Sequence, residues 1–265
     1  MNIFLREMKA NRKALIIWCV SVFLLVAMGM VKYAGLAESG DAINEMMNQL
    51  PKGMKAVFGL GTLNLTEVSG YYGMFFLYFL LMGTTHAAML GANIISKEER
   101  DKTVEFLLVK PSNRNKIITA KLLAALVNVI IFNISTLISS IIFVGIHNKG
   151  ESINKEIVLL MVAMFILQLI FLAIGSTMAA ISRRPKTAAS AATGIMLITF
   201  LISVAIDMND KLDKLKYFTP FKYFKAADLM FGYGFDRFFV VLSATIIVMF
   251  IGITYVFYNK RDLYV

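Results

Sequence analysis

The chain has 265 residues, of which 58% are hydrophobic and 17% charged, and its mean hydropathy is +0.70. A soluble domain of this size could not bury so much apolar surface in one core, so the composition indicates a membrane protein. A net charge of +10 would suggest a nucleic-acid partner for a soluble protein, but in a membrane protein it must first be compared with the topology.

Residues 2–13 form an amphipathic opening in which Arg6, Lys9 and Lys13 fall on one helical face and Phe4 and Met8 on the opposite face. This pattern predicts an N-terminal interfacial helix. It would either contact a cytoplasmic partner or anchor the first span, and the sequence favours neither. The apolar run that follows has about spanning length and no small-residue cleavage pattern, so we expect a retained span and not a signal peptide.

Six apolar runs are long enough to cross a bilayer, which needs about 20 residues. They cover approximately residues 14–34, 71–95, 117–146, 157–181, 187–206 and 238–258. No internal repeat or low-complexity linker interrupts them. We therefore expect an all-α integral membrane protein with six transmembrane helices in a single transmembrane domain over residues 1–265.

The basic residues predict the orientation of these spans. If the N-terminus is cytoplasmic, the inside segments contain 16 of the 27 basic residues and 6 of the 17 acidic residues, and the outside segments contain 11 of each. The whole net charge then lies on the cytoplasmic side, as the positive-inside rule requires. We expect a multi-pass protein of the cell membrane with both termini cytoplasmic and with no nucleic-acid partner.

Three outside loops follow from this orientation. The first, residues 35–70, contains an amphipathic stretch at 41–58 interrupted by Pro51, which we expect on the membrane surface. The second, residues 147–156, is short and polar. The third, residues 207–237, is charged at first and then aromatic and glycine-containing. It is too short and broken to span, and it predicts a re-entrant extracellular segment before the last span.

The loop at residues 96–116 is the only long, densely charged segment between two strongly apolar ones. Ser96 and Glu99 have the spacing of a capping box, so a helix could restart here, or the second span could continue into the cytoplasm. Val104, Leu107 and Leu108 share one helical face. Pro111 would end that helix and Ser112 could cap the next. The segment predicts a short amphipathic helix at the membrane surface.

The order of residues in this loop resembles the cytoplasmic loop of ABC-2 type transporter permeases, which joins the second and third spans and contains the coupling helix. The matching positions are Thr103, Glu105, Leu107, Leu108, Pro111, Arg114 and Lys121, whereas Lys102 stands where the family pattern has glycine. The segment Thr219-Pro-Phe-Lys-Tyr-Phe224 is also similar to the region before the last span of many such permeases.

The resemblance implies a type V ABC exporter fold. It further implies a second permease copy, in a homo- or heterodimer, and a cytoplasmic ATPase subunit bound through the coupling helix. The residues that it assigns to ATPase coupling are Glu98, Glu99, Arg100, Thr103, Glu105, Phe106, Leu107, Leu108, Pro111, Arg114 and Lys121. The sequence has no G-x-x-x-x-G-K-[ST] motif, so we expect no catalytic residue and no cofactor in this chain, with ATP and Mg²⁺ in the partner subunit.

Polar residues within the spans are the candidates for a substrate path, because polar groups are costly at membrane depth. These residues are Asn128, Asn133, Ser135 and Gln168. The alternative is that these residues form hydrogen bonds to neighbouring helices. The pairs Gly175 with Ala179 and Ser176 with Ala180 are expected to let neighbouring helices pack closely. His86 and His147 are far apart and the only cysteine is Cys19, so we expect no metal site and a packed core position for His86.

The resemblance implies export of an unidentified substrate, which we expect to be amphipathic or hydrophobic. A membrane-embedded ligand-binding scaffold or immunity protein without transport is the alternative. An intramembrane enzyme is a third reading, because Glu98-Glu99 resembles half of a glutamate-type abortive-infection protease motif. That motif expects an arginine four residues after the second glutamate, where this chain has Thr103.

Overall fold

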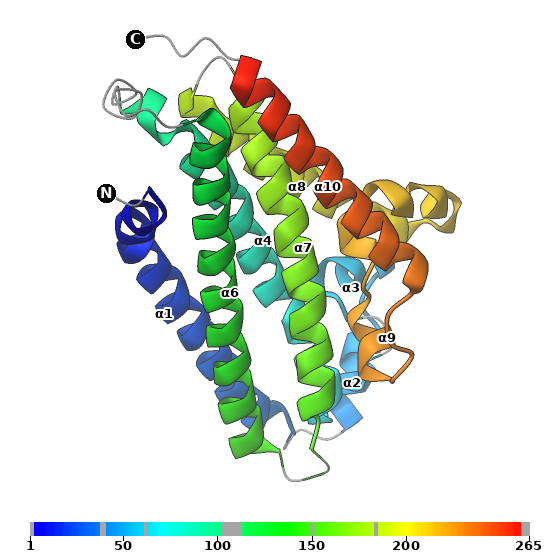
Figure 1. Ribbon diagram of the computed structural model, residues 1–265. Helices are drawn as coiled ribbons and strands as arrows, with labels where there is room; N and C mark the ends of the chain where they lie inside the picture. The colour runs from blue at the N-terminus through cyan, green and yellow to red at the C-terminus, as the bar shows by residue number, and fades with distance from the viewer. Residues whose placement is uncertain are drawn as a thin grey trace.

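The structure is a computed structural model that describes residues 3–37, 41–60, 63–101, 113–148, 150, 152–182 and 185–260. Six long helices run side by side in one bundle (Figure 1). They are α1 (Ile3–Ala37), α4 (Val68–Arg100), α6 (Arg114–His147), α7 (Asn154–Ile181), α8 (Ala188–Met208) and α10 (Arg237–Lys260). All six are long and apolar enough to cross a membrane, as the six predicted spans require, and these residue ranges contain no strand.

Both chain termini lie at the same end of the bundle, where α1 begins and α10 ends (Figure 1). The last residue of α4, Arg100, and the first residue of α6, Arg114, are at this end too. We call it the termini end and the opposite end the loop end. The short elements at the loop end are α2 (Asp41–Asn48), α3 (Lys52–Phe58), η2 (Asp210–Phe218), η3 (Pro220–Lys222) and α9 (Ala226–Met230), and η1 (Pro185–Thr187) precedes α8 at the termini end.

The predicted N-terminal interfacial helix is not a separate element. Residues 3–13 are the first turns of α1, which continues without a break to Ala37. No proline or glycine interrupts the chain between Ile3 and Met28, so nothing in the sequence ends the helix at the boundary between polar and apolar residues. The side chain of Glu7 in this region is fully buried, so these turns pack against the bundle.

The centre of the bundle is the contact between α4 and α7. A Cβ atom at Gly91 would lie 2.3 Å from the carbonyl oxygen of Leu172, and one at Gly175 would lie 2.3 Å from that of Ala88. Only glycine allows the two backbones to approach so closely. The packing role expected of Gly175 is therefore confirmed.

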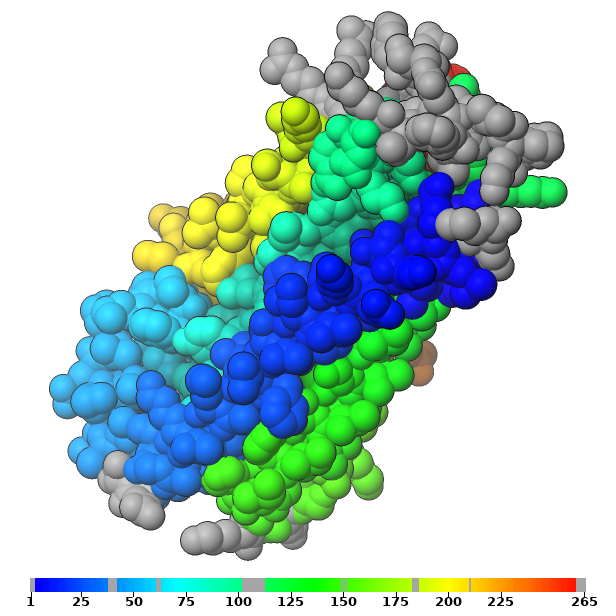
Figure 2. Space-filling model, turned by 90° about the vertical axis from the view of Figure 1, so that its left-hand side faces the viewer, coloured from blue at the N-terminus to red at the C-terminus, as the bar shows by residue number. Residues whose placement is uncertain are grey.

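The remaining long helices surround this pair. In the apolar window of α7 67% of the residues are buried, against 11% in that of α10, so α7 is central and α10 peripheral. α1 lies across the face formed by α4 and α6, as the space-filling view shows (Figure 2). Its outer face exposes large apolar side chains, among them Ile17, Met28 and Val31. Such a surface is suited to lipid.

The segments between the long helices at the loop end agree in part with the predictions from the sequence. Pro51 precedes the first residue of α3 and separates it from α2, as expected of the interrupted amphipathic stretch. Between α8 and α10 the chain forms only short helices. Its aromatic half packs inward, since the ring of Phe221 lies 5.4 Å from that of Phe171 and 5.5 Å from that of Phe200.

Candidate functional site

Five charged side chains from three helices meet at the termini end of the bundle. They are Arg6 and Glu7 of α1, Lys97 and Glu98 of α4, and Lys121 of α6. We call them the charge cluster. The positive and negative groups alternate along it, from Lys97 through Glu7, Arg6 and Glu98 to Lys121.

Glu98 joins all three helices. Its Oε1 accepts a hydrogen bond of 2.8 Å from Nη2 of Arg6, and its Oε2 accepts one from Nζ of Lys121. Lys121 also donates to the carbonyl oxygen of Ile94, one turn before Glu98 on α4, at 2.6 Å. The side chain of Lys121 is fully buried and that of Glu98 is 6% exposed. The α4–α6 ion pair is therefore almost completely screened from water.

Glu7 makes the second connection between α1 and α4. Nζ of Lys97 donates to its Oε2 at 2.7 Å, and Nη2 of Arg6 donates to its Oε1 at 2.9 Å. Glu7 has no exposed surface, whereas Lys97 and Arg6 keep 24% and 30% of their side chains exposed. The cluster thus opens to solvent on its cationic side and has a formal charge of +1.

Burial decides how strongly the cluster constrains the helices. Removing one partner of a buried ion pair costs about 3–5 kcal/mol, because the other charge is left without compensation. A surface pair contributes only about 0–1 kcal/mol. Separating α4 from α6 would leave Lys121 or Glu98 in this unfavourable state. The cluster therefore resists relative motion of α1, α4 and α6 at this end.

The local sequence explains why these side chains face inward. Ser96 donates its hydroxyl hydrogen to the carbonyl oxygen of Ala92 at 2.8 Å, inside an unbroken α4. Of the two possibilities that the capping-box spacing left open, the span therefore continues and no helix restarts at Ser96. α6 begins at Arg114, and the side chain of Asn113 caps it by accepting from the backbone N–H of Asn115. Asn113 thus has the capping role that was predicted for Ser112.

Two further coupling candidates make contacts at the same end. Arg114 donates to the carbonyl oxygen of Asn259 at 3.0 Å, and Asn259 donates to the side chain of Asn115 at 2.6 Å, so the start of α6 is tied to the end of α10. Arg100 pairs with Asp101 and donates to Asn93 on its own helix. Glu99 lies on α4 and is half-buried.

The other coupling candidates lie outside the described residues, because the structure describes neither residues 102–112 nor their side chains. They are Thr103, Glu105, Phe106, Leu107, Leu108 and Pro111, and Lys102 belongs to the same range. Their roles stay predictions.

Glu98 and Lys121 both find partners within the chain. The carboxylate of Glu98 is occupied by Arg6 and Lys121 and is nearly inaccessible, and the coupling roles of Glu98 and Lys121 stay predictions. A pair with an external cation would require breaking a buried pair. Their place next to the ends of the 102–112 segment instead suits them to hold the flanking helices.

The four polar residues considered for a substrate path form hydrogen bonds within the bundle. Asn133 of α6 donates to the side chain of Gln168 of α7 at 3.1 Å, and Gln168 is fully buried. Asn128 donates to the carbonyl oxygen of Ala124 at 2.7 Å and faces Met8 of α1. Ser135 accepts through its backbone from Ser139. These contacts favour the alternative, in which polar groups hold helices together.

His86 occupies the packed position expected for it. Its ring lies between those of Trp18 and Phe132, with centroid distances of 5.4 and 5.1 Å, and it is 4% exposed. Among the residues that the structure describes, no group of three His, Cys, Asp or Glu side chains could hold a metal ion.

Sequence reasoning missed the two α1 members of the cluster. Arg6 was placed on a basic face in the interface, and Glu7 was counted only in the charge balance. One signal was available, because Glu7 is the only acidic residue among the first 37 and lies beside an arginine on a helix otherwise basic or apolar. A lone carboxylate in such a place calls for a cationic partner from another helix.

Six apolar helices of spanning length, three of them joined by buried ion pairs at the end where both termini lie, define a multi-pass helical membrane protein. The model of the ABC-2 family transporter proteins matches residues 1–263, so the chain belongs to this family. Permeases of the family lack an ATPase domain and work with ATPase subunits. A comparison with curated proteins found no match to the chain.

Proposed function

We propose that this chain is the membrane-spanning subunit of an exporter and is driven by a separate cytoplasmic ATPase. The observation that carries the proposal is the charge cluster next to the segment 102–112 in a chain of the ABC-2 family. The concentration of basic residues at the termini end supports a cytoplasmic location for both termini. The separate ATPase subunit would hold ATP and Mg²⁺.

The cluster gives this coupling a physical route. α4 ends and α6 begins beside the segment 102–112, and Glu98 and Lys121 join these two helices within a few turns of its edges. Arg6 and Glu7 add α1 to the same unit. A displacement of the segment by the ATPase would therefore move α1, α4 and α6 together instead of bending one helix.

A second permease copy completes the proposed exporter. α8 begins with the small residues Ala188 to Gly194. Ala188 and Ala192 are buried in the bundle, but Ser190 is exposed and a Cβ atom at Gly194 would meet nothing within 4 Å. This open, smooth face supports close packing of a helix from another copy. The substrate is expected to be amphipathic or hydrophobic, and the last subsection of the Results narrows its class.

Charge reversal in the segment 102–112 tests the role of the ATPase. We expect Glu105→Lys to weaken co-purification of the ATPase with the tagged chain from native membranes, because a charge at the proposed contact would be inverted. Asp213→Lys is the matched control, since Asp213 is exposed on η2 at the loop end. Equal ATPase retention by wild type and Glu105→Lys would contradict the role of this residue. Ligand-stimulated ATP hydrolysis without transport would favour the scaffold function.

A further inference from the structure

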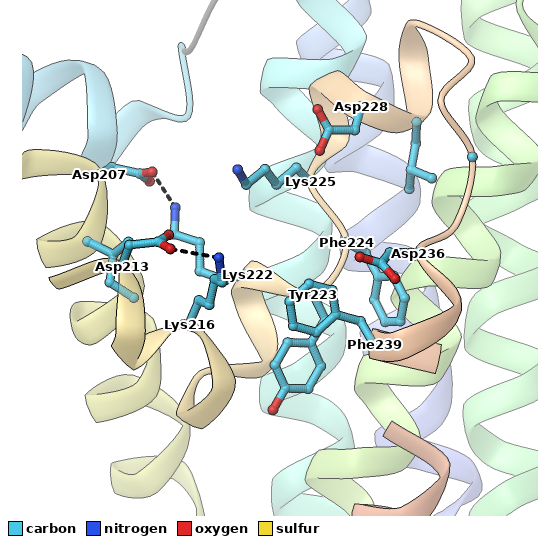
Figure 3. A pocket seen from close by; sticks show the side chains of 13 residues that line it. Asp207, Asp213, Lys216, Lys222, Tyr223, Phe224, Lys225, Asp228, Asp236 and Phe239 are labelled. Carbon is cyan, nitrogen blue, oxygen red and sulfur yellow. Dashed lines mark hydrogen bonds and ion pairs between the residues drawn. The ribbon is translucent and has the colours of Figure 1, made fainter. Parts of the chain in front are cut away.

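Two pockets lie next to each other at the loop end and share Asp207, Lys222, Phe224 and Lys225. The first has a volume of about 380 Å³ and lies between the end of α8, η2, α9 and the start of α10 (Figure 3). The second has a volume of about 360 Å³ and lies between α3, α4, α8 and the chain around η3. Both are within the size range of small-molecule sites, about 300–1,000 Å³.

The two pockets differ in the sign of their charge. The first, which we call the acidic pocket, is lined by four aspartates and three lysines: Asp207, Asp213, Asp228, Asp236, Lys216, Lys222 and Lys225. Burial raises the pKa of Tyr223, which also lines it, to about 12, so this phenol adds no negative charge at neutral pH. The second, the basic pocket, is lined by four lysines and one aspartate: Lys52, Lys55, Lys222, Lys225 and Asp207. An anion is therefore attracted to the basic pocket.

The lysines of the basic pocket retain capacity for a ligand. Lys222 is buried and pairs with Asp207, whose side chain is 45% exposed. Lys225 is exposed and has no ion pair with any other described residue. Figure 3 shows its ammonium group reaching toward the corner where Lys222 meets Asp207. An ammonium group has three donors, so the two lysines can bind one anionic oxygen group between them.

The rest of the basic pocket is apolar. It is lined by aromatic and aliphatic side chains from α4, α8 and the chain around η3: Phe76, Leu77, Leu80, Phe200, Phe221 and Phe224. Leu77 and Phe200 are half-buried and keep surface that a ligand could cover, whereas Phe76 and Leu80 are only 2% and 5% exposed and belong to the core of the bundle. A ligand that satisfied only the lysines would leave the apolar part of the pocket unfilled, whereas a hydrocarbon chain would cover it.

The position of α3 places the pocket at the depth where the headgroup of a lipid meets its hydrocarbon chains. α3 exposes Met54, Val57 and Phe58 and contributes Lys52 and Lys55 to the pocket. Exposed apolar residues beside lysines are typical of a helix lying in the membrane interface. The lysines would then lie at headgroup depth and Leu77 and Phe200 toward the hydrocarbon.

We propose that the basic pocket binds an anionic phospholipid, with its phosphate between Lys222 and Lys225 and an acyl chain against Leu77 and Phe200. This lipid class is the cargo of the exporter, a step that rests on the proposed function. The binding itself does not require transport or an ATPase.

Binding is tested with the purified full-length chain in detergent micelles by native mass spectrometry. The probes are phosphatidylglycerol, phosphatidylcholine with the same acyl chains, and glycerol 3-phosphate. We expect phosphatidylglycerol to bind at least about tenfold more tightly than either other probe, because only it supplies both an unpaired anion and a chain. Equal binding of the two lipids would overturn the proposal, and so would equally tight binding of glycerol 3-phosphate, which would indicate a site for free anions.

Paired lysine variants locate the site. We expect Lys222→Gln/Lys225→Gln to bind phosphatidylglycerol roughly tenfold more weakly than wild type. Lys52→Gln/Lys225→Gln keeps the buried Lys222–Asp207 pair and should show a loss even if the first variant folds poorly. Lys211→Gln/Lys214→Gln removes the same charge from exposed positions on η2, outside the pocket, and should bind like wild type. Wild-type affinity in the Lys52/Lys225 variant would contradict the proposal.

The outcome is separable from the exporter function. Selective lipid binding by a chain that retains no ATPase would support the proposed ligand class and contradict the transport step. Lack of selectivity for phosphatidylglycerol in a chain that still couples to its ATPase would support the exporter function and contradict the proposed ligand class.

Discussion

The carboxylate of Glu98 is the single group on which the charge cluster depends. It accepts from Arg6 of α1 and from Lys121 of α6, and Lys121 has no exposed surface. Without that carboxylate, Lys121 would keep only the carbonyl oxygen of Ile94 as a partner among the contacts described above. A buried ammonium group in that state is strongly unfavourable.

Replacing Glu98 should therefore destabilise the protein. We expect Glu98→Ala to lower the free energy of unfolding by about 3–5 kcal/mol, measured as a lower midpoint of thermal unfolding in detergent. Asp101→Ala is the matched control, because Asp101 is 49% exposed and pairs at the surface with Arg100. It should cost less than about 1 kcal/mol.

A double variant separates the loss of an ion pair from the loss of packing. Glu98→Ala/Lys121→Met removes both buried charges and should recover most of the stability, since an apolar side chain of similar length replaces the lysine. A double variant as unstable as Glu98→Ala alone would show that Lys121 is not what the carboxylate compensates.

The site could be predicted from the sequence only in part. The motif predicts a functional role for Glu98 and Lys121. It does not predict that their side chains point into the bundle, because a charged residue near a loop is normally solvated. Arg6, the second cation bound by Glu98, is 92 residues away from it in the sequence. Such a pairing depends on how α1 lies against α4 and α6, and no local pattern specifies it.

At the scale of helices, the crossing of α4 and α7 determines the shape of the bundle. Leu172 and Ala88 approach Gly91 and Gly175 through their carbonyl oxygens, so neither contact can yield by a change of rotamer. The helix backbones themselves would have to separate.

A methyl group at this crossing should be poorly tolerated. We expect Gly91→Ala to lower the free energy of unfolding by about 1–3 kcal/mol, the usual cost of overpacking, although alanine is the better helix former. The measurement is the unfolding midpoint. Gly252→Ala in α10 has open space around its Cβ atom and should be neutral or stabilising by up to about 1 kcal/mol. Destabilisation of both variants to the same extent would refute the role of the crossing.

The long helices themselves were predictable because apolar length is a direct requirement of the bilayer. Their ends were less so. α1 begins eleven residues before the predicted start of the first span at residue 14, because its polar turns stay helical and pack on the bundle. Pro51 marked the break between α2 and α3 correctly, since proline lacks the N–H that a continuing helix needs.

Across the whole molecule, α4 connects the two features on which function is argued. Glu98 near its termini end belongs to the charge cluster, and Leu80 nearer its loop end lines the basic pocket. The two residues are separated by 18 positions, or about 27 Å of helix. A rigid α4 held to α1 and α6 would transmit a displacement at the segment 102–112 to the wall of the pocket.

We propose that an ATPase moves α1, α4 and α6 as one unit through the charge cluster. The measurement is the distance between spin labels on the chain bound to its ATPase in lipid vesicles, with and without ATP and vanadate. One pair, Lys32→Cys with Tyr233→Cys, compares α1 with the loop before α10, and a second pair, Lys32→Cys with Ile146→Cys, lies within the proposed unit. All carry Cys19→Ser, which removes the only native cysteine.

We expect nucleotide to change the 32–233 distance and to leave the 32–146 distance unchanged. In the background of Glu98→Ala/Lys121→Met, which lacks the buried α4–α6 pair, the nucleotide-dependent change should become smaller. A 32–233 distance that is the same with and without nucleotide, or a change of equal size in the double variant, would show that the charge cluster does not move the three helices as one unit.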